Sequence, residues 1–172
     1  MSDDTTAPWR ELALAVGRGG ADVVGLQGAA RGLAALRMLA PGSGLRAVLA
    51  VTVDEEEADL LARDLAFFLG EGSPGAPAVV RVPADPVLPY DDLSPDRALE
   101  MDRLAALCRL HLHGSAVRAV VVSARGLARR MVPKTVFEAH ADLLGKGATL
   151  ERDAFAARLV ALGYARAPVV ED

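Results

Sequence analysis

The sequence is poor in cysteine, lysine and aromatic residues, and each shortage excludes something. The single cysteine, Cys108, cannot form a disulfide within the chain and fits a reducing compartment. Lysine occurs only at Lys134 and Lys146, and the net charge of -4 gives no overall attraction for nucleic acid. Aromatic residues make up 4% of the chain, so a core has to be built from alanine, leucine and valine.

Long apolar runs are also missing. None approaches the ~20 residues that a membrane span needs, and no secretory apolar region follows the acidic opening "MSDDTTAPWR". We therefore expect a cytoplasmic protein without membrane contacts.

Apolar residues are nevertheless abundant, at 52% of the 172 residues. Four apolar runs alternate with amphipathic helical patterns, which is typical of a parallel sheet covered on both faces. We predict an α/β fold, a mainly parallel sheet flanked by helices. The predicted strands are Asp22 to Leu26, Arg46 to Thr52, Val79 to Val82 and Val117 to Val122. The predicted helices cover about residues 8–16, 29–39, 54–70, 94–112 and 125–131, the fourth with Ser94 as its N-cap and Pro95 in its first position.

The tail has a different pattern. Residues 139–147 predict a strand and a turn, and residues 151–164 predict a helix that ends at Gly163. This is the order expected at the opening of another unit. We predict a first domain over residues 1–145 and, over residues 146–172, the truncated beginning of a second α+β domain.

The stretch "VVGLQGAARGLAAL", residues 23–36, has the outline of a phosphate-binding loop: an apolar run, a glycine-rich turn and a helical pattern. An intact P-loop reads G-x-x-x-x-G-K-S/T. Gly25 fits the first glycine, and Gly28 lets the turn form. Ala30, Arg31 and Gly32 stand at the second glycine, the lysine and the serine or threonine. The frame is kept while its chemistry is changed.

These replacements remove the groups that hold a nucleotide. Ala30 is poorly suited to a positive φ, Arg31 does not replace lysine in a tight cradle, and Gly32 has no hydroxyl for magnesium. If each lost charged hydrogen bond is worth about 1.5–3 kcal/mol, losing two or three weakens binding by about 10²-fold to more than 10⁴-fold. We predict a structural relic that binds no cofactor. Weak phosphate binding at the helix N-terminus is the alternative.

No other group of residues indicates catalysis or metal binding. Acids at Asp54 to Glu57 follow a strand as a magnesium ligand would, but the helix dipole explains acids in a first helical turn. His111 and His113 are two residues apart on a helix and point away from each other. The basic cluster in "RGLARRMVPK" has no aromatic neighbours and is typical of a solvated face. We expect no catalytic residues and no metal.

Three stretches occur in this order: "DEEEADLLARDLAFFLG", "LPYDDLSPDRALEMDRLAALCRL" and "LERDAFAARLVALGY". Together they resemble the N-terminal region of the bacterial transcription-repair coupling factor (Mfd). The resemblance runs from about Val23 to the C-terminus, and the "LPYDDLSP" signature with the helix after it is its most specific part. In that family, this region is similar to the nucleotide-excision-repair protein UvrB, whose P-loop is intact.

The resemblance implies a degenerate P-loop NTPase fold like UvrB domain 1, with a non-catalytic role in transcription-coupled nucleotide excision repair. The full family protein is an ATP-dependent DNA translocase that displaces stalled RNA polymerase and recruits UvrA. Its ATP and Mg bind in motor domains later in the chain, and other domains contact RNA polymerase and DNA. UvrA is the partner implied for this region, although only the first helix and strand of the UvrA-binding domain are present.

The resemblance also implies a difference from UvrB. UvrB has a long β-hairpin near the third strand, and the twelve residues "ADPVLPYDDLSP" found here are too short for one.

Two other interpretations remain open. One makes the chain a small independent P-loop nucleotide-binding protein that uses Gly25, Gly28 and Arg31. The other makes it a docking or autoinhibitory piece that packs against the rest of its own protein, which suits the apolar composition.

Overall fold

The computed structural model describes residues 7–39, 44–70, 77–85, 87, 96–141 and 144–167. The chain divides into two compact units, Met1–Met131 and Val132–Asp172. The domain boundary predicted from the sequence lies later, between residues 145 and 146. None of the helices in the described ranges is long and apolar enough to cross a membrane.

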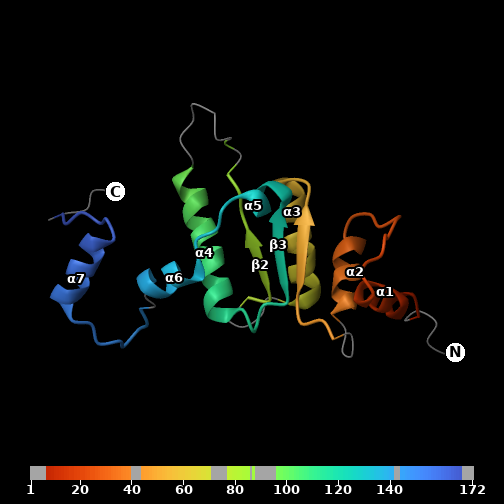
Figure 1. The fold of residues 1–172 in the computed structure, drawn as a ribbon, viewed down its shortest axis with the longest axis horizontal. Coiled ribbons are helices and arrows are strands. Elements are labelled where there is room, and N and C mark those ends of the chain that lie inside the picture. The colour runs from red at the N-terminus through yellow and green to blue at the C-terminus, as the bar shows by residue number, and fades with distance from the viewer. Residues whose placement is uncertain are drawn as a thin grey trace. The chain divides into compact units, whose positions relative to one another are not determined.

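The first unit is built around a small parallel sheet (Figure 1). Its described strands are β1 (Val48–Thr52), β2 (Val79–Val82) and β3 (Ala119–Ser123), in the spatial order β1-β3-β2. Both outer strands run parallel to β3, and Val48 and Val79 each lie opposite Ala119. The predicted α/β fold with a parallel sheet is therefore confirmed, and three of the four predicted strands are present with slightly different ends.

Five helices of this unit correspond to the five predicted from the sequence. They are α1 (Ala7–Gly17), α2 (Ala30–Met38), α3 (Glu55–Leu69), α4 (Arg97–His113) and α5 (Ala124–Ala128). Asp54 caps α3 because its carboxylate accepts the Glu57 N–H at 2.8 Å. Helix α4 begins at Arg97, with Asp96 as its cap, rather than at the predicted Pro95. The predicted cap, Ser94, lies outside the described residues.

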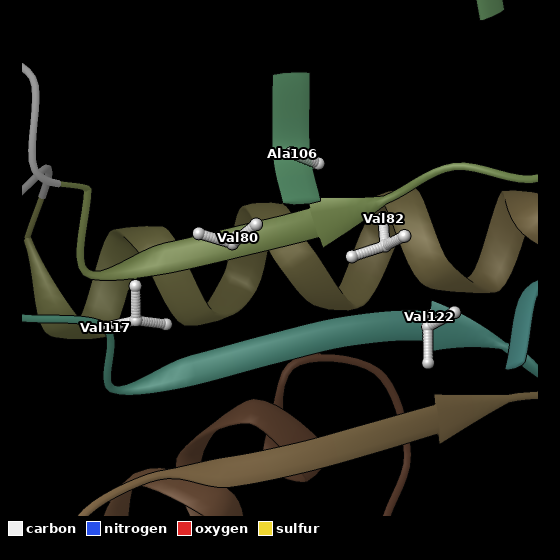
Figure 2. Packing of buried hydrophobic residues seen from close by; sticks show 5 residues of the cluster. All are labelled: Val80, Val82, Ala106, Val117 and Val122. Atoms are coloured by element: carbon white, nitrogen blue, oxygen red, sulfur yellow. The ribbon is translucent and has the colours of Figure 1, made fainter. Parts of the chain in front are cut away.

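Helices α3 and α4 cover opposite faces of the sheet, because successive strand residues point to opposite sides. On one face, Leu65 of α3 packs in a core with Val121 of β3. On the other face, Ala106 of α4 packs with Val80 and Val82 of β2 (Figure 2). This double cover explains why β3 reads as a continuous apolar run, whereas β2 is interrupted by Arg81, which pairs with acids of α3.

Strand β1 is covered on one face only. Val48 and Ala50 pack against the core beneath α3. Leu49 and Val51 point the other way and are 58% and 49% exposed. Helix α4 reaches β2 but, within the described residues, does not cover β1.

The predicted strand over Asp22 to Leu26 is wrong. These residues form no strand, and Val24 is 90% exposed. A strand is stable only when a neighbour pairs with its backbone, and no described strand lies beside this run. The apolar pattern therefore predicted a strand that has no partner here.

The second unit contains α6 (Lys134–His140) and α7 (Arg152–Ala161). The predicted helix is confirmed by α7, and Gly163 follows it with a φ of 94°. The predicted strand over residues 139–147 is wrong at its start, because Ala139 and His140 belong to α6, although a turn is present at Lys146. No residue of either helix is buried. The beginning of an α+β domain over residues 146–172 stays a prediction.

Candidate phosphate-binding site

The glycine-rich segment before α2 forms a turn, as predicted. Gly25 and Gly28 have φ values of 82° and 52°, in the left-handed region that glycine favours. Helix α2 begins at Ala30, and Ala29, at its N-cap, offers no side-chain hydrogen bond. Ala30 is thus helical, and the left-handed conformation for which alanine is unsuited is not needed there.

Two backbone donors at the start of α2 already bond within the turn. The N–H of Ala30 donates to the Gln27 carbonyl at 3.2 Å, and the N–H of Arg31 donates to the Gly28 carbonyl at 3.3 Å. In an intact P-loop, successive N–H groups point at the phosphates instead. The turn is therefore closed on itself.

Arg31, at the lysine position, forms an ion pair with Glu57 of α3. The same carboxylate accepts the Val53 N–H at 3.1 Å, just after β1. The Val53 N–H and the Arg31 guanidinium hold the pKa of Glu57 below its ordinary value. The charge that could meet a phosphate is thus matched by a carboxylate from within the chain.

Gly32, at the serine or threonine position, is buried where α2 packs on α3. A Cβ added there would lie 3.1 Å from the Asp64 Cβ and 3.5 Å from the Phe68 ring. The missing hydroxyl therefore has a structural reason, since close helix packing takes up the position. The sequence alone showed the loss of the magnesium ligand but not this packing.

Comparison with known proteins adds the family. No protein-family model matches the chain. Over 150 residues, which are 86% of this chain, the sequence is 49% identical to the transcription-repair-coupling factor of Myxococcus xanthus. The chain is homologous to part of a transcription-repair-coupling factor. The resemblance predicted from the three motifs is confirmed, and the chain spans 12% of the length of that relative.

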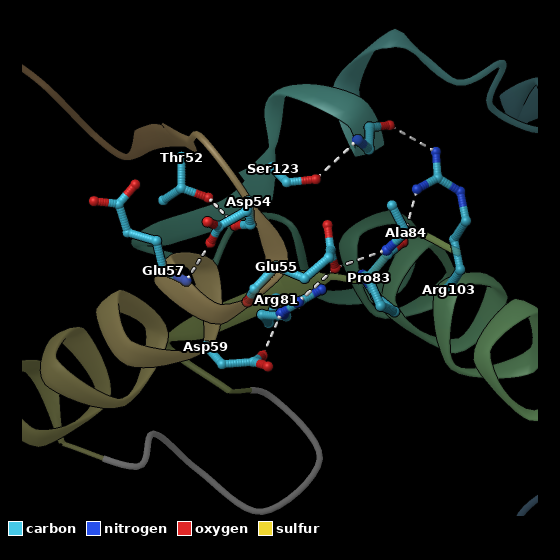
Figure 3. Close-up of polar contacts among 11 residues, drawn as sticks. Thr52, Asp54, Glu55, Glu57, Asp59, Arg81, Pro83, Ala84, Arg103 and Ser123 are labelled. Atoms are coloured by element: carbon cyan, nitrogen blue, oxygen red, sulfur yellow. Dashed lines mark hydrogen bonds and ion pairs between the residues drawn. The ribbon is translucent and has the colours of Figure 1, made fainter. Parts of the chain in front are cut away.

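In this chain, the carboxyl ends of the strands are also filled by the chain's own side chains (Figure 3). Ligands of open parallel sheets usually bind at this edge. Here Glu55 Oε2 accepts Arg81 Nη2 at 2.6 Å and the Ala84 N–H at 3.0 Å. Arg81 Nε also lies 2.7 Å from Asp59 Oδ1. The acids after β1 therefore cap α3 and neutralise Arg81.

Glu55 is ionised because of these partners. Partial burial raises the pKa of a carboxyl group, but hydrogen bonds from Ser123, the Ala84 N–H and Arg81 outweigh it and lower the pKa of Glu55 below 4.5. This carboxylate therefore acts as an acceptor that joins the start of α3 to the ends of β2 and β3.

A buried arginine of α4 holds two backbone segments together near the carboxyl ends of the strands. Arg103 of α4 is 5% exposed. Its Nη1 donates to the Pro83 carbonyl at 2.8 Å and its Nη2 to the Gly126 carbonyl at 3.1 Å (Figure 3). The Ser123 Oγ accepts the Gly126 N–H at 3.0 Å. Charged donors on backbone carbonyls are strong hydrogen bonds, so Arg103 holds the end of β2 and the start of α5 together.

Asp85, just after β2, is 2% exposed and joins two segments that are distant in sequence. Its Oδ1 accepts the Val87 N–H and its Oδ2 accepts the Asp96 N–H, both at 2.8 Å. One carboxylate therefore holds both ends of the connection between β2 and α4.

Other charged candidates have partners within the described residues. Within the described ranges, no group of three or more His, Cys, Asp or Glu side chains could hold a metal ion. Arg129 of the basic cluster pairs with Glu100 at 3.1 Å, and Lys134 lies 3.5 Å from Glu138. The expectation that no cofactor and no metal bind this segment stays a prediction.

Proposed function

We propose that this chain is the non-catalytic, UvrB-like module of a transcription-repair-coupling factor and serves as a scaffold for UvrA recruitment. The observation that carries the proposal is the 49% identity to such a factor over 86% of the chain. Displacement of RNA polymerase, DNA translocation and ATP hydrolysis with magnesium belong, in this proposal, to other domains of a longer protein.

The glycine-rich segment before α2 supports the non-catalytic part of the proposal, because its groups have partners within the chain. Arg31 is paired with Glu57, and the first N–H groups of α2 bond within the turn. Gly32 is packed against α3. A nucleotide phosphate would have to displace the ion pair between Arg31 and Glu57, and Gly32 offers no hydroxyl to hold magnesium.

The open face of β1 supports a module that packs within a larger protein. Leu49 and Val51 are half exposed on a sheet face, and Val53 is 81% exposed. A sheet of this class is normally covered on both faces. The 12% coverage of the relative leaves ample chain to provide that cover. Intramolecular packing, including an autoinhibitory one, is the second role that this face favours.

The exposed apolar residues of the second unit support the proposal that it forms only part of a partner-binding surface. Tyr164 is 61% exposed, Val160 55% and Leu162 38%. An open groove of about 420 Å³ lies in this unit, lined by Leu144, Ala148, Thr149, Leu150, Glu151, Ala154, Phe155 and Arg158. A short helix with this much apolar exposure needs further packing to be stable. We propose that this unit forms the UvrA-binding surface together with another segment of the longer protein.

The UvrA proposal is tested by titrating UvrA with residues 1–172 and with a longer segment that runs through the complete second domain. We expect weak or no binding for residues 1–172 and clear binding for the longer segment. Equal affinity would place the recognition surface within residues 1–172, and no binding by either would contradict UvrA recruitment.

The non-catalytic proposal is tested by calorimetry with Mg-ATP. We expect no heat of binding at micromolar protein and no ATP turnover. A micromolar dissociation constant would instead support the independent nucleotide-binding protein.

A further inference from the structure

The outward side of α3 exposes large apolar side chains. Phe67 is 83% exposed and Leu60 is 51% exposed. They share one side of the helix with Arg63, because residues three, four and seven apart lie on one face. The opposite side of α3 packs in the core and against α2. Aromatic residues, phenylalanine included, and arginine are enriched at protein interfaces relative to the rest of the surface.

A groove of about 440 Å³ adjoins this side of α3. Its lining is apolar at Ala62 and Ala66 of α3 and at Val79 of β2, and polar at Asp59, Arg63 and Arg81. Alanine side chains leave room that a leucine or phenylalanine from a partner would fill. Arg63 belongs both to the groove and to the exposed stripe, so the two form one continuous surface.

The charges of this surface are unbalanced at one residue. Arg81 is neutralised by Glu55 and Asp59. Arg63 donates its Nε only to the Asp59 backbone carbonyl, at 3.2 Å, and among the described residues no carboxylate forms an ion pair with it. A partner that brings a carboxylate to Arg63 would complete the charge pairing.

We propose that the α3 surface, which comprises Leu60, Arg63, Phe67 and the adjoining groove, docks a protein segment that carries a carboxylate between large apolar side chains. The carboxylate binds Arg63, one apolar side chain enters the groove beside Ala62 and Ala66, and another covers Phe67. This role goes beyond the proposed function, in which UvrA binding belongs to the second unit.

The test is selection from a phage-displayed library of random twelve-residue peptides on the purified chain. The enriched peptides are then measured against wild type, Phe67→Ser, Arg63→Glu and the matched control Arg109→Glu, which reverses an exposed arginine on α4. Circular dichroism and thermal unfolding show that each variant is folded. Substitutions at exposed positions such as these usually leave the fold intact. Sedimentation velocity measures self-association of the chain.

We expect enriched peptides with an aspartate or glutamate beside leucine or phenylalanine. Arg63→Glu and Phe67→Ser should each weaken their binding by about tenfold or more, and Arg109→Glu should not. A peptide with lysine in place of its acid should regain affinity for Arg63→Glu. No enriched peptide, binding that is insensitive to Arg63 and Phe67, or a dimer that buries Phe67 would each overturn the proposal.

Discussion

Restoring the threonine of an intact P-loop at Gly32 should destabilise the first unit instead of creating a magnesium site. The added Cβ would lie 3.1 Å from the Asp64 Cβ, so the neighbouring atoms must shift by a few tenths of an ångström. Threonine adds two more heavy atoms beyond it. Overpacking of a close contact costs about 1–3 kcal/mol, and the gain in helix propensity over glycine is only about 0.3 kcal/mol. We expect a net loss of about 0.7–2.7 kcal/mol.

The assay is urea unfolding followed by circular dichroism, with Gly32→Ala as the matched control. Alanine adds the Cβ alone and gains about 1 kcal/mol of helix propensity, so its free energy of unfolding should stay close to wild type. Calorimetry with Mg-ATP on the same Gly32→Thr protein should remain flat. A threonine variant as stable as the alanine variant would refute the view that helix packing fixes this glycine.

Three further outcomes are expected. Arg103→Met should lower the free energy of unfolding by about 2–4 kcal/mol, because two buried carbonyls lose their donor, while Arg109→Met should change little in the same urea titration. Asp54→Ala should cost about 1 kcal/mol through loss of the α3 cap, and Asp54→Ser should restore most of it. Because the pKa of the Glu55 carboxyl group is lowered on folding, the stabilisation of the fold by its negative charge is complete above pH 4.5. This stabilisation is lost as the pH falls through the lowered pKa. The difference in urea midpoint between wild type and Glu55→Gln should therefore shrink on acidification, and a difference that grows would contradict it.

The sequence predicted the three strands that pair in the sheet. Val80 and Val82 pack on the α4 side and Val121 packs on the α3 side, and the apolar residues of these runs identified β2 and β3. The run over residues 22–26 is also apolar at Val23, Val24 and Leu26 but has no pairing strand, and composition carries no information about a missing neighbour. The strand prediction was wrong there because a sequence pattern does not show which segments lie beside one another in the fold.

The candidate phosphate-binding site was likewise predictable only in part from the sequence. Which P-loop groups are lost at Ala30, Arg31 and Gly32 was readable from the sequence, because each group has its own residue type. What replaced them was not readable. The partner of Arg31 lies 26 residues away on α3, and the neighbours of Gly32 are also on α3. Contacts between elements distant in sequence depend on how the helices pack.

Because of the buried Asp85, the stability of the fold depends little on the length of the connection between β2 and α4. Since its two oxygens accept the Val87 and Asp96 N–H groups, the two ends of the connection lie beside one carboxylate. The entropy of closing a loop grows only by about 0.6 kcal/mol for each doubling of its length. The connection can therefore be lengthened or shortened without rebuilding the sheet, and its length is a weak determinant of stability.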